Sequence, residues 1–201
     1  DISIGTATGV MTFNSAPDYE TQTSYSLTVT ATDDTNSSTQ DITVSINNLN
    51  DNTPVISSDA TFSVDENETD IGTITATDAD GDTLTYSISG SDISIDSSTG
   101  VMTFDSAPDY ETQQSYSATV TVSDGTNSSS QGITISINDV QDESPTFISS
   151  STFSVEENQT SIGTVVATDG DGDTLTYSIT GSDISIDSST GVMTFNSAPD
   201  Y

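Results

Sequence analysis

The chain has 201 residues, of which 32 are Asp or Glu and none is Lys, Arg, His, Cys or Trp, so its formal net charge is −32. Without those side chains, nucleophilic triads, thiol chemistry, Schiff bases and imidazole acid–base catalysis are excluded, and so are zinc sites built on His or Cys. A surface with no basic residue does not suit nucleic acid. No carboxylate can pair with a side-chain cation, so each is hydrated, repelled by its neighbours or bound to a metal ion.

The sequence is organised as a long repeat. Equivalent segments begin at Asp1, Asp92 and Asp183, so the period is 91 residues, and the two later copies differ only at Asp105 and Asn196. A constant period indicates one structural unit repeated along the chain. We predict the end of one repeat in 1–52, a complete repeat in 53–142 and the start of a third in 143–201.

Within each repeat, apolar residues alternate with Ser and Thr, which is typical of half-buried antiparallel strands. The strands predicted in chain order are Tyr25–Thr32 and Ile42–Ile46, then one near Phe62, Ile71–Thr77, Leu84–Ile88, Ile93–Ile95, Val101–Phe104, Tyr116–Val122 and Ile133–Ile137. Such phased alternation is not expected of a disordered chain, although the acidic composition alone suggests one. Seven short strands per repeat favour an all-β fold of tandem Greek-key β-sandwiches, immunoglobulin-like and stacked end to end.

Carboxylates gather where the predicted strands begin and end. The central repeat carries Glu66-Asn67, Asp78-Ala79-Asp80, Asp109-Tyr110-Glu111, the lone Asp124 and an acidic segment at 138–143. In this order the motifs resemble those of the cadherin repeat, especially the tandem repeats of bacterial extracellular adhesins and surface fibres. The resemblance covers the whole chain and implies a cadherin-like sandwich with Ca²⁺ bound where two repeats meet.

The resemblance also implies which residues bind calcium. The first junction would use Asp18, Glu20, Asn50, Asp51, Asn52, Asp78, Asp80 and Asp124. The second would use Glu66, Asp109, Glu111, Gln141, Asp142, Glu143, Asp169 and Asp171. Asn50 and Gln141 would contribute backbone carbonyls. Both linkers keep the Asp that bridges two calcium ions in the family, but their other positions depart from its pattern, so the number of ions is left open.

The chemistry of the residues points to calcium independently. Ca²⁺ takes six to eight oxygen ligands in flexible geometry, whereas Mg²⁺ requires a strict octahedron and releases its water reluctantly. Two carboxylates about 4 Å apart repel by about 4 kcal/mol at an effective dielectric of about 20, so crowded carboxylates favour a divalent cation. Four Asn-x-Ser/Thr sequons begin at Asn36, Asn67, Asn127 and Asn158. The motif is short, and chance explains it best in a chain this rich in Ser and Thr.

Two functions compete. The first is a calcium-rigidified structural repeat of an extracellular stalk, adhesin or filament; the second is an adhesive module that binds a partner cell, a like repeat or carbohydrate. Both imply a non-enzymatic protein outside the cell or at its surface. The expected partners are neighbouring repeats through calcium junctions, with like filaments or a cell-surface ligand as further candidates, and with no nucleic acid and no membrane insertion by these residues. Because the chain opens and closes within a repeat, we expect it to be cut from a longer array rather than completed by strand donation between molecules.

Overall fold

The computed structural model describes residues 1–90, 92–181 and 183–200. Ser91, Ser182 and Tyr201 lie outside the described residues. Tyr201 is the last residue of the predicted range 143–201. All regular elements within the described residues are β-strands. No described segment forms a helix with the length and apolar character that a membrane crossing requires.

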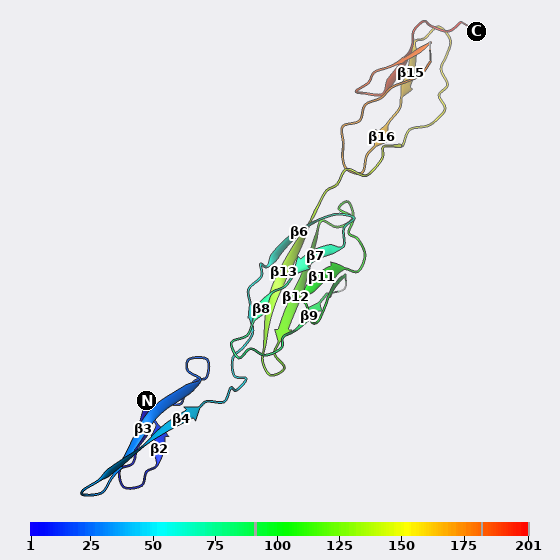
Figure 1. Ribbon diagram of the computed structural model, residues 1–201. Coiled ribbons are helices and arrows are strands. Elements are labelled where there is room, and N and C mark those ends of the chain that lie inside the picture. The colour runs from blue at the N-terminus through cyan, green and yellow to red at the C-terminus, as the bar shows by residue number, and fades with distance from the viewer. Residues whose placement is uncertain (91, 182, 201) are drawn as a thin grey trace. The chain divides into compact units, whose positions relative to one another are not determined.

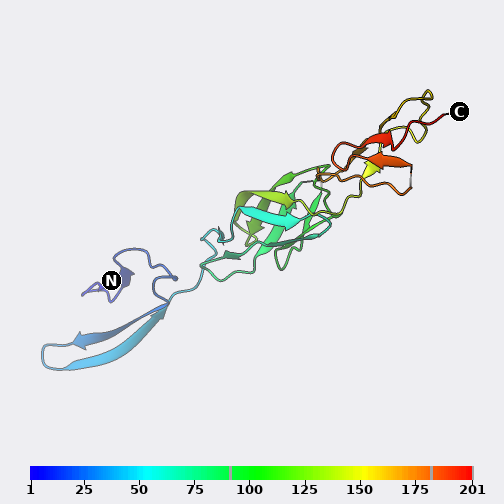
Figure 2. The ribbon, with the colours of Figure 1, turned by 90° about the horizontal axis from the view of Figure 1, so that it is seen from above.

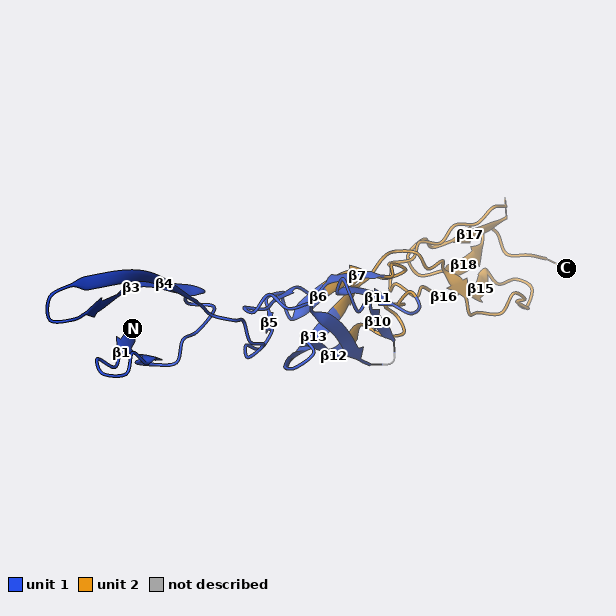
Figure 3. Cartoon of the chain, turned by 60° about the horizontal axis from the view of Figure 1, so that its bottom comes forward, with its two compact units in different colours: residues 1–62, 70–106, 117–135 blue, residues 63–69, 107–116, 136–201 orange. Residues whose placement is uncertain are grey.

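Two compact units make up the chain (Figure 3). The first unit consists of residues 1–62, 70–106 and 117–135, and the second of residues 63–69, 107–116 and 136–201. The first linker, defined as Asn48–Asn52, lies in the first unit, and the second linker, Asp139–Glu143, lies in the second. Each linker therefore lies in the same unit as the acidic residues close to it.

The chain begins with two hairpins, the second of which is long (Figures 1 and 2). The first five strands of the chain are β1 (Ile2–Ile4), β2 (Met11–Phe13), β3 (Ser24–Thr32), β4 (Ser37–Ser45) and β5 (Val55–Ile56). β1 pairs with β2, and β3 pairs with β4 so that Leu27 lies opposite Ile42. β3 and β4 match the strands predicted from the alternating pattern, although β4 begins at Ser37, earlier than predicted.

The central repeat contains two larger sheets. Its strands are β6 (Thr61–Asp65), β7 (Asp70–Thr73), β8 (Ala76–Thr77), β9 (Thr85–Ser89), β10 (Ile93–Ile95), β11 (Val101–Phe104), β12 (Ser115–Ser123) and β13 (Ser128–Asn138). One sheet has the order β10-β11-β7 and the other has the order β6-β13-β12-β9, while β8 pairs with β5. All pairings given are antiparallel, as the alternating pattern predicts.

One predicted strand is wrong. Residues 71–77 were expected to form a single strand, but they form β7 and β8, which pair with different partners, β11 and β5. Between them the amide of Ile74 donates to the carbonyl of Gly100, and the Ile74 side chain is fully buried. Ile71 and Ile74 are three residues apart, so the period-two pattern shifts by one residue at this crossing, where the backbone changes partners.

The buried core is made by the alternating apolar residues of these strands. In the central repeat the buried apolar residues are Val64, Ile71, Ile93, Met102, Phe104, Ala118, Val120, Val122, Ile133, Ile135 and Ile137, together with Ile74 between β7 and β8. Burying an aliphatic side chain of this size stabilises a fold by about 1.5–3 kcal/mol. The strand positions between them carry Ser and Thr and are mainly exposed or half-buried.

The later strands repeat the earlier ones. They are β14 (Thr146–Phe147), β15 (Ser161–Thr164), β16 (Ala167–Thr168), β17 (Ile184–Ile186) and β18 (Val192–Phe195). β17 pairs with β18 so that Ile184 lies opposite Phe195, the same register that places Ile93 opposite Phe104 and Ile2 opposite Phe13. The three copies of the repeated segment therefore fold alike, as one structural unit should. The division at 52 and 142 stays a prediction.

Candidate metal centres

Three carboxylates from distant segments meet at the first linker. Glu20 follows β2, Asp51 belongs to the linker, and Asp80 lies in the loop after β8. Each offers an oxygen, and these oxygens lie within 4.8 Å of one another. All three were predicted as ligands from the sequence. The hydrogen bond from the Glu20 backbone amide lowers the pKa of its carboxyl, but burial and the nearby carboxylates of Asp80 and Asp18 raise that pKa above its usual value.

Asp80 anchors the linker to the central repeat. Its Oδ2 accepts hydrogen bonds from the backbone amides of Asp51 at 3.1 Å and Asn52 at 2.9 Å, and its Oδ1 accepts one from Asn52 Nδ2 at 3.1 Å. The bond from the Asn52 amide is the main reason why the pKa of Asp80 lies below its usual value. Hydrogen bonds to the ionised form favour it. Asp80 is therefore held as a carboxylate beside two further acids.

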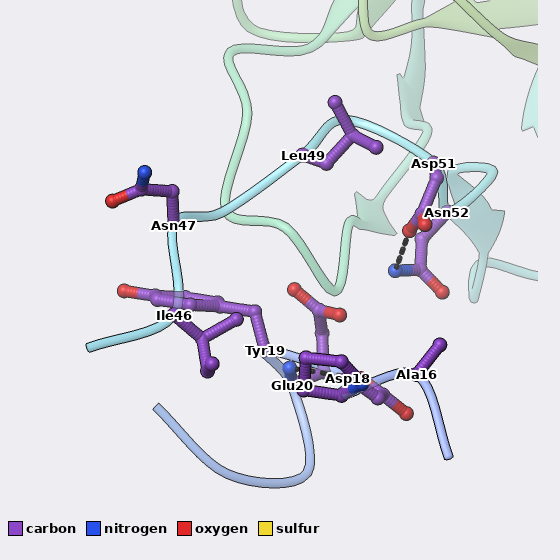
Figure 4. Close-up of a pocket in the computed structure, with 10 residues that line it drawn as sticks. Ala16, Asp18, Tyr19, Glu20, Ile46, Asn47, Leu49, Asp51 and Asn52 are labelled. Carbon is purple, nitrogen blue, oxygen red and sulfur yellow. Dashed lines mark hydrogen bonds between the residues drawn. The ribbon is translucent and has the colours of Figure 1, made fainter. Parts of the chain in front are cut away.

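A pocket with a volume of about 580 Å³ opens beside this cluster. Asp18, Tyr19 and Glu20 line it on one side, while Asp51 and Asn52 lie on the opposite side of the opening (Figure 4). A water molecule takes about 30 Å³ of liquid, so the space admits more than one hydrated cation. The lining combines carboxylate and amide oxygens, which are the donors that Ca²⁺ prefers.

Two carboxylates of the central repeat have an oxygen that is buried without a hydrogen-bond partner among the described residues. Asp78 Oδ1 accepts from the Asp80 amide at 2.9 Å, and Asp124 Oδ1 accepts from the amides of Thr126 and Asn127 at 2.6 Å. The second oxygen of each, Oδ2, is the unpartnered one. A buried carboxylate oxygen without a donor is costly, and a metal ion would satisfy it.

A second set of acids surrounds the start of the second linker. Oxygens of Glu66, Glu111 and Asp139 lie within 4.8 Å of one another. Glu66 is only 3% exposed, and it accepts hydrogen bonds from the amides of Val140 at 2.8 Å and Tyr110 at 2.9 Å. Burial first, and then the neighbouring carboxylates, raise the pKa of both Glu111 and Asp139. Raised acid pKa values show that negative charge is unfavourable here without a cation.

The following loop brings a further group to the same linker. Oxygens of Asp169, Asp171 and Asp173 lie within 4.8 Å of one another. Asp171 Oδ2 accepts from the Glu143 amide at 3.0 Å, and Gln141 Nε2 donates to Asp173 Oδ1 at 2.8 Å. Asp171 Oδ1 is buried and has no hydrogen-bond partner among the described residues. The two sets of acids thus both reach the second linker.

Three predicted ligands accept side-chain hydrogen bonds from neighbouring protein groups. Asp18 and Asp109 accept hydrogen bonds within their own turns, from Thr21 and Thr112, and those bonds lower the pKa of both. Asp142 Oδ2 accepts from Asn67 Nδ2 at 2.6 Å. Asn67 has a φ of 65°, a left-handed conformation that Asn adopts more readily than most residues. That contact gives the sequon at Asn67 a structural role.

Three residues of the clusters were not in the predicted set: Asp82, Asp139 and Asp173. Asp139 occupies the leading acidic position of the linker motif, and that position alone was reason to include it among the predicted ligands. Asp82 and Asp173 extend the Asp-x-Asp motif by two residues and recur at the 91-residue spacing. Burial, together with the carboxylates of Asp78, Asp80 and Asp124, raises the pKa of Asp82. Recurrence of an acid at the repeat spacing was thus the available signal.

Comparison with known proteins identifies the architecture. Residues 60–138 match the cadherin domain. The fold is cadherin-like. Human Protocadherin-11 X-linked is 35% identical over 184 residues, which cover 83% of this chain and 14% of that protein. Mouse Protocadherin Fat 4 is 33% identical over 189 residues, which cover 84% of this chain and 4% of that protein. The chain therefore spans about a seventh or less of these relatives.

Solved cadherin structures share the fold. Mouse Cadherin-23 EC22-24 has a TM-score of 0.70 and 27% identity, over 95% of this chain and 69% of that one. Human CDH23 EC21-23 has a TM-score of 0.81 over 99% of this chain and 72% of that one, and at 23% identity it shows the fold alone. The predicted all-β fold of cadherin-like sandwich repeats is thereby confirmed, and so is the predicted extracellular, cell-surface location.

Proposed function

We propose that the chain is a calcium-rigidified structural repeat of an extracellular stalk, adhesin or filament, with Ca²⁺ bound at both linkers. The observation that carries this proposal is the set of buried, unpartnered carboxylate oxygens on Asp78, Asp124 and Asp171. The chain has no Lys, Arg or His that could neutralise them. A divalent cation with oxygen ligands supplies what these atoms lack.

The donors suit Ca²⁺ better than Mg²⁺. At the first linker the proposed ligands are Asp18, Glu20, Asn50, Asp51, Asn52, Asp78, Asp80 and Asp124. At the second they are Glu66, Asp109, Glu111, Gln141, Asp142, Glu143, Asp169 and Asp171, joined by Asp139. These oxygens come from loops and turns rather than from one rigid element, and Ca²⁺ tolerates such irregular coordination. The bound ion supplies positive charge to groups that otherwise repel one another.

Rigidity follows from where the donors lie. Glu20 precedes the first linker, Asp51 belongs to it, and Asp80 follows it. An ion that holds all three ties two successive repeats to the peptide between them. Without the ion, the same carboxylates repel and the linker is free to bend. Calcium would then act as a structural clamp, with no chemical turnover.

Small-angle scattering with Ca²⁺ and with a chelator tests the proposal. We expect the maximum dimension and the melting temperature to fall when calcium is removed, and Asp142→Ala to reproduce the loss at the second linker only. Asp105→Asn is the matched control, because it removes one charge away from the linkers and installs the residue that the third copy carries at Asn196. An unchanged maximum dimension and melting temperature in chelator would overturn the proposal.

An adhesive role is the second candidate, because the matched relatives are named as protocadherins from human and mouse. In that case the repeats would themselves contact a partner cell, a like repeat or carbohydrate, without enzymatic activity. Beads coated with the chain distinguish the two: calcium-dependent aggregation or glycan capture supports adhesion, whereas dispersed beads support a spacer. The finer resemblance to bacterial adhesins stays a prediction, since the relatives described above are animal proteins.

A further inference from the structure

Asn127 connects the β12–β13 turn of the central repeat to the first linker. Its Nδ2 donates two hydrogen bonds, to Asn50 Oδ1 at 3.1 Å and to the Asn52 carbonyl at 2.9 Å. The three residues are all part-buried, and more than 70 residues separate Asn127 from the linker in sequence. An amide nitrogen with two good acceptors satisfies both of its donor positions. Both side-chain donor positions of Asn127 are therefore used in hydrogen bonds to the linker.

The same turn makes a second contact with the chain just after the linker. Ser129 donates its hydroxyl to the carbonyl of Pro54, whose side chain is fully buried. The linker is also held by Asp80, which accepts hydrogen bonds from the amides of Asp51 and Asn52. The β12–β13 turn and the loop after β8 therefore both form hydrogen bonds with residues 50–54. None of these hydrogen bonds involves an ion.

We propose that Asn127, supported by Ser129, is a positioning residue that fixes the first linker in its ligand-presenting arrangement before calcium binds. The proposal rests on the proposed function and adds to it a neutral residue outside the ligand set. It also assigns a role to the Asn127-Ser128-Ser129 sequon, because the nitrogen that would carry a glycan is the donor of both linker bonds. Preorganisation of this kind raises affinity by lowering the cost of ordering the site.

The chain contains a matched control at the equivalent position, Asn36. The two Asn residues share a local turn: the Asn36 amide donates to Asp33 Oδ1 at 2.6 Å, as the Asn127 amide does to Asp124 Oδ1 at 2.6 Å. The Asn36 side chain is exposed, and the sequence continues with the same two serines. Replacing Asn36 therefore removes the same side chain from the same turn and leaves the first linker's contacts in place.

The first test needs no calcium. Amide hydrogen exchange is measured by NMR in chelator for the wild type, Asn127→Ala, Asn127→Ser and Asn36→Ala. In Asn127→Ala we expect the amides of Asp51 and Asn52 to exchange about tenfold faster, because two hydrogen bonds of ordinary strength no longer hold the linker. Asn127→Ser keeps one donor and should fall between, while Asn36→Ala should match the wild type. Unchanged protection of Asp51 and Asn52 in Asn127→Ala overturns the clamp.

The second test is calcium titration of the same variants by calorimetry. We expect Asn127→Ala to weaken one class of sites about tenfold, equivalent to about 1.4 kcal/mol, and to leave the class at the second linker unchanged. The double variant with Asn50→Ala should lose less than the sum of the single losses, because the two side chains share one bond. Equal weakening at both linkers, or full additivity, overturns the positioning role. If no variant binds calcium, the proposed function fails, and the exchange data still decide whether the clamp exists.

Discussion

The two linkers present the same aspartate to different neighbours. Asp80 and Asp171 are equivalent, and each accepts a hydrogen bond from the backbone amide two residues beyond the linker's central position, that of Asn52 or Glu143. At the first linker Asp80 Oδ1 also accepts from Asn52 Nδ2. At the second, Asp171 Oδ1 is buried with no hydrogen-bond partner among the described residues. At the first linker both carboxylate oxygens of the aspartate accept hydrogen bonds from the described protein groups, whereas at the second linker only one of the two does.

A single substitution explains the difference. Asn52 carries an amide that can donate, whereas its counterpart Glu143 is an acceptor when ionised and cannot. A second change accompanies it: Gly170 stands where the first junction has Ala79, and a Cβ at Gly170 would lie 2.8 Å from Glu143 Cγ. Glu143 in its present position therefore requires glycine at 170, and a larger residue there would make the acid shift. The second linker has exchanged a hydrogen-bond donor for another potential calcium ligand.

The comparison teaches that repeats of nearly identical sequence can depend on a cation to different degrees. A buried acceptor without a donor costs free energy until something satisfies it. At the first linker the oxygens without a hydrogen-bond partner among the described residues belong to Asp78 and Asp124. Asp80, which holds the linker amides, has protein donors on both oxygens, so the amide of Asn52 should keep some order without calcium. At the second linker the oxygen left without a partner in the described chain belongs to Asp171, the residue that holds the amide of Glu143, so calcium removal should release that amide more readily.

The largest expected effect is therefore an unequal response to calcium removal. In chelator we expect the amide of Glu143 at the second linker to lose at least tenfold more hydrogen-exchange protection than the amide of Asn52 at the first, since Asp80 keeps accepting from Asn52 Nδ2. Both amides can be followed by NMR in one sample, so each is the internal reference for the other. Equal loss at both linkers would contradict the comparison.

Exchanging the two side chains should exchange the behaviour. Glu143→Asn gives the second linker a donor for Asp171 Oδ1 and removes a potential ligand, so ion-free protection should rise while calcium affinity falls about tenfold. Asn52→Glu should do the opposite at the first linker, where the loss of Asn52 Nδ2 leaves Asp80 Oδ1 without its donor. Calorimetry and hydrogen exchange report the two quantities separately. If protection and calcium affinity rise or fall together, the hydrogen-bond donor and the calcium ligand are not alternatives at this position.

A smaller effect is expected at Gly170. Gly170→Ala should displace Glu143 and weaken calcium binding at the second linker by a few fold, because a contact of 2.8 Å forces the acid to move. Combined with Glu143→Asn, the alanine should become neutral, since Asn52 and Ala79 coexist at the first linker. Ala79→Gly is the matched control. If Gly170→Ala costs as much in the Glu143→Asn background as in the wild type, the crowding argument is wrong.

Much of this arrangement was predictable from the sequence. The alternation from Tyr116 to Val122 and from Ile133 to Ile137 identified β12 and β13, because a period of two places one face in the core. Glu20, Asp51 and Asp80 were assigned to one junction through the resemblance to cadherin repeats, and their oxygens do lie within 4.8 Å of one another, while their role as ligands stays a prediction. In both cases the information lies in residue type and spacing, which a single chain displays directly.

The remainder depends on contacts between segments that no spacing reveals. Asn127 looked like part of a chance sequon, because its two acceptors lie more than 70 residues away. The split of 71–77 into β7 and β8 was missed because the sequence shows only a three-residue step from Ile71 to Ile74 and not that the two parts pair with different strands. Glu143 was assigned as a ligand, correctly placing it at the linker, but the unsatisfied oxygen of Asp171 becomes visible only when hydrogen bonds are traced.

The smallest effect concerns aspartates away from the linkers that have one oxygen with several protein donors. In the turn after β17, Asp187 Oδ1 accepts from the hydroxyl and amide of both Ser189 and Thr190, at 2.8–3.0 Å. These bonds, led by that from the Ser189 hydroxyl, lower the pKa of Asp187 from 3.8 to about 2. The equivalent turn in the central repeat has Asp96 with the same four bonds, whereas the first repeat has Gly5.

Because the pKa of Asp187 is lower in the folded state than in the unfolded chain, its contribution to stability is present above about pH 4 and is lost as the pH falls towards 2. Asp187→Asn keeps an oxygen acceptor without the charge, so it should lower the urea midpoint slightly at pH 7, with a difference that shrinks as the pH falls from 4 towards 2. The measurement is made on protein freed of calcium beforehand, so that protons do not act by displacing calcium from the linkers, and is repeated with calcium added, with Asp105→Asn as the charge control. A difference that persists unchanged at pH 2 would mean that the turn depends on geometry alone. A difference that appears only with calcium present would show that acid acts through the linkers, and the distinction between satisfied turns and unsatisfied linkers would fail.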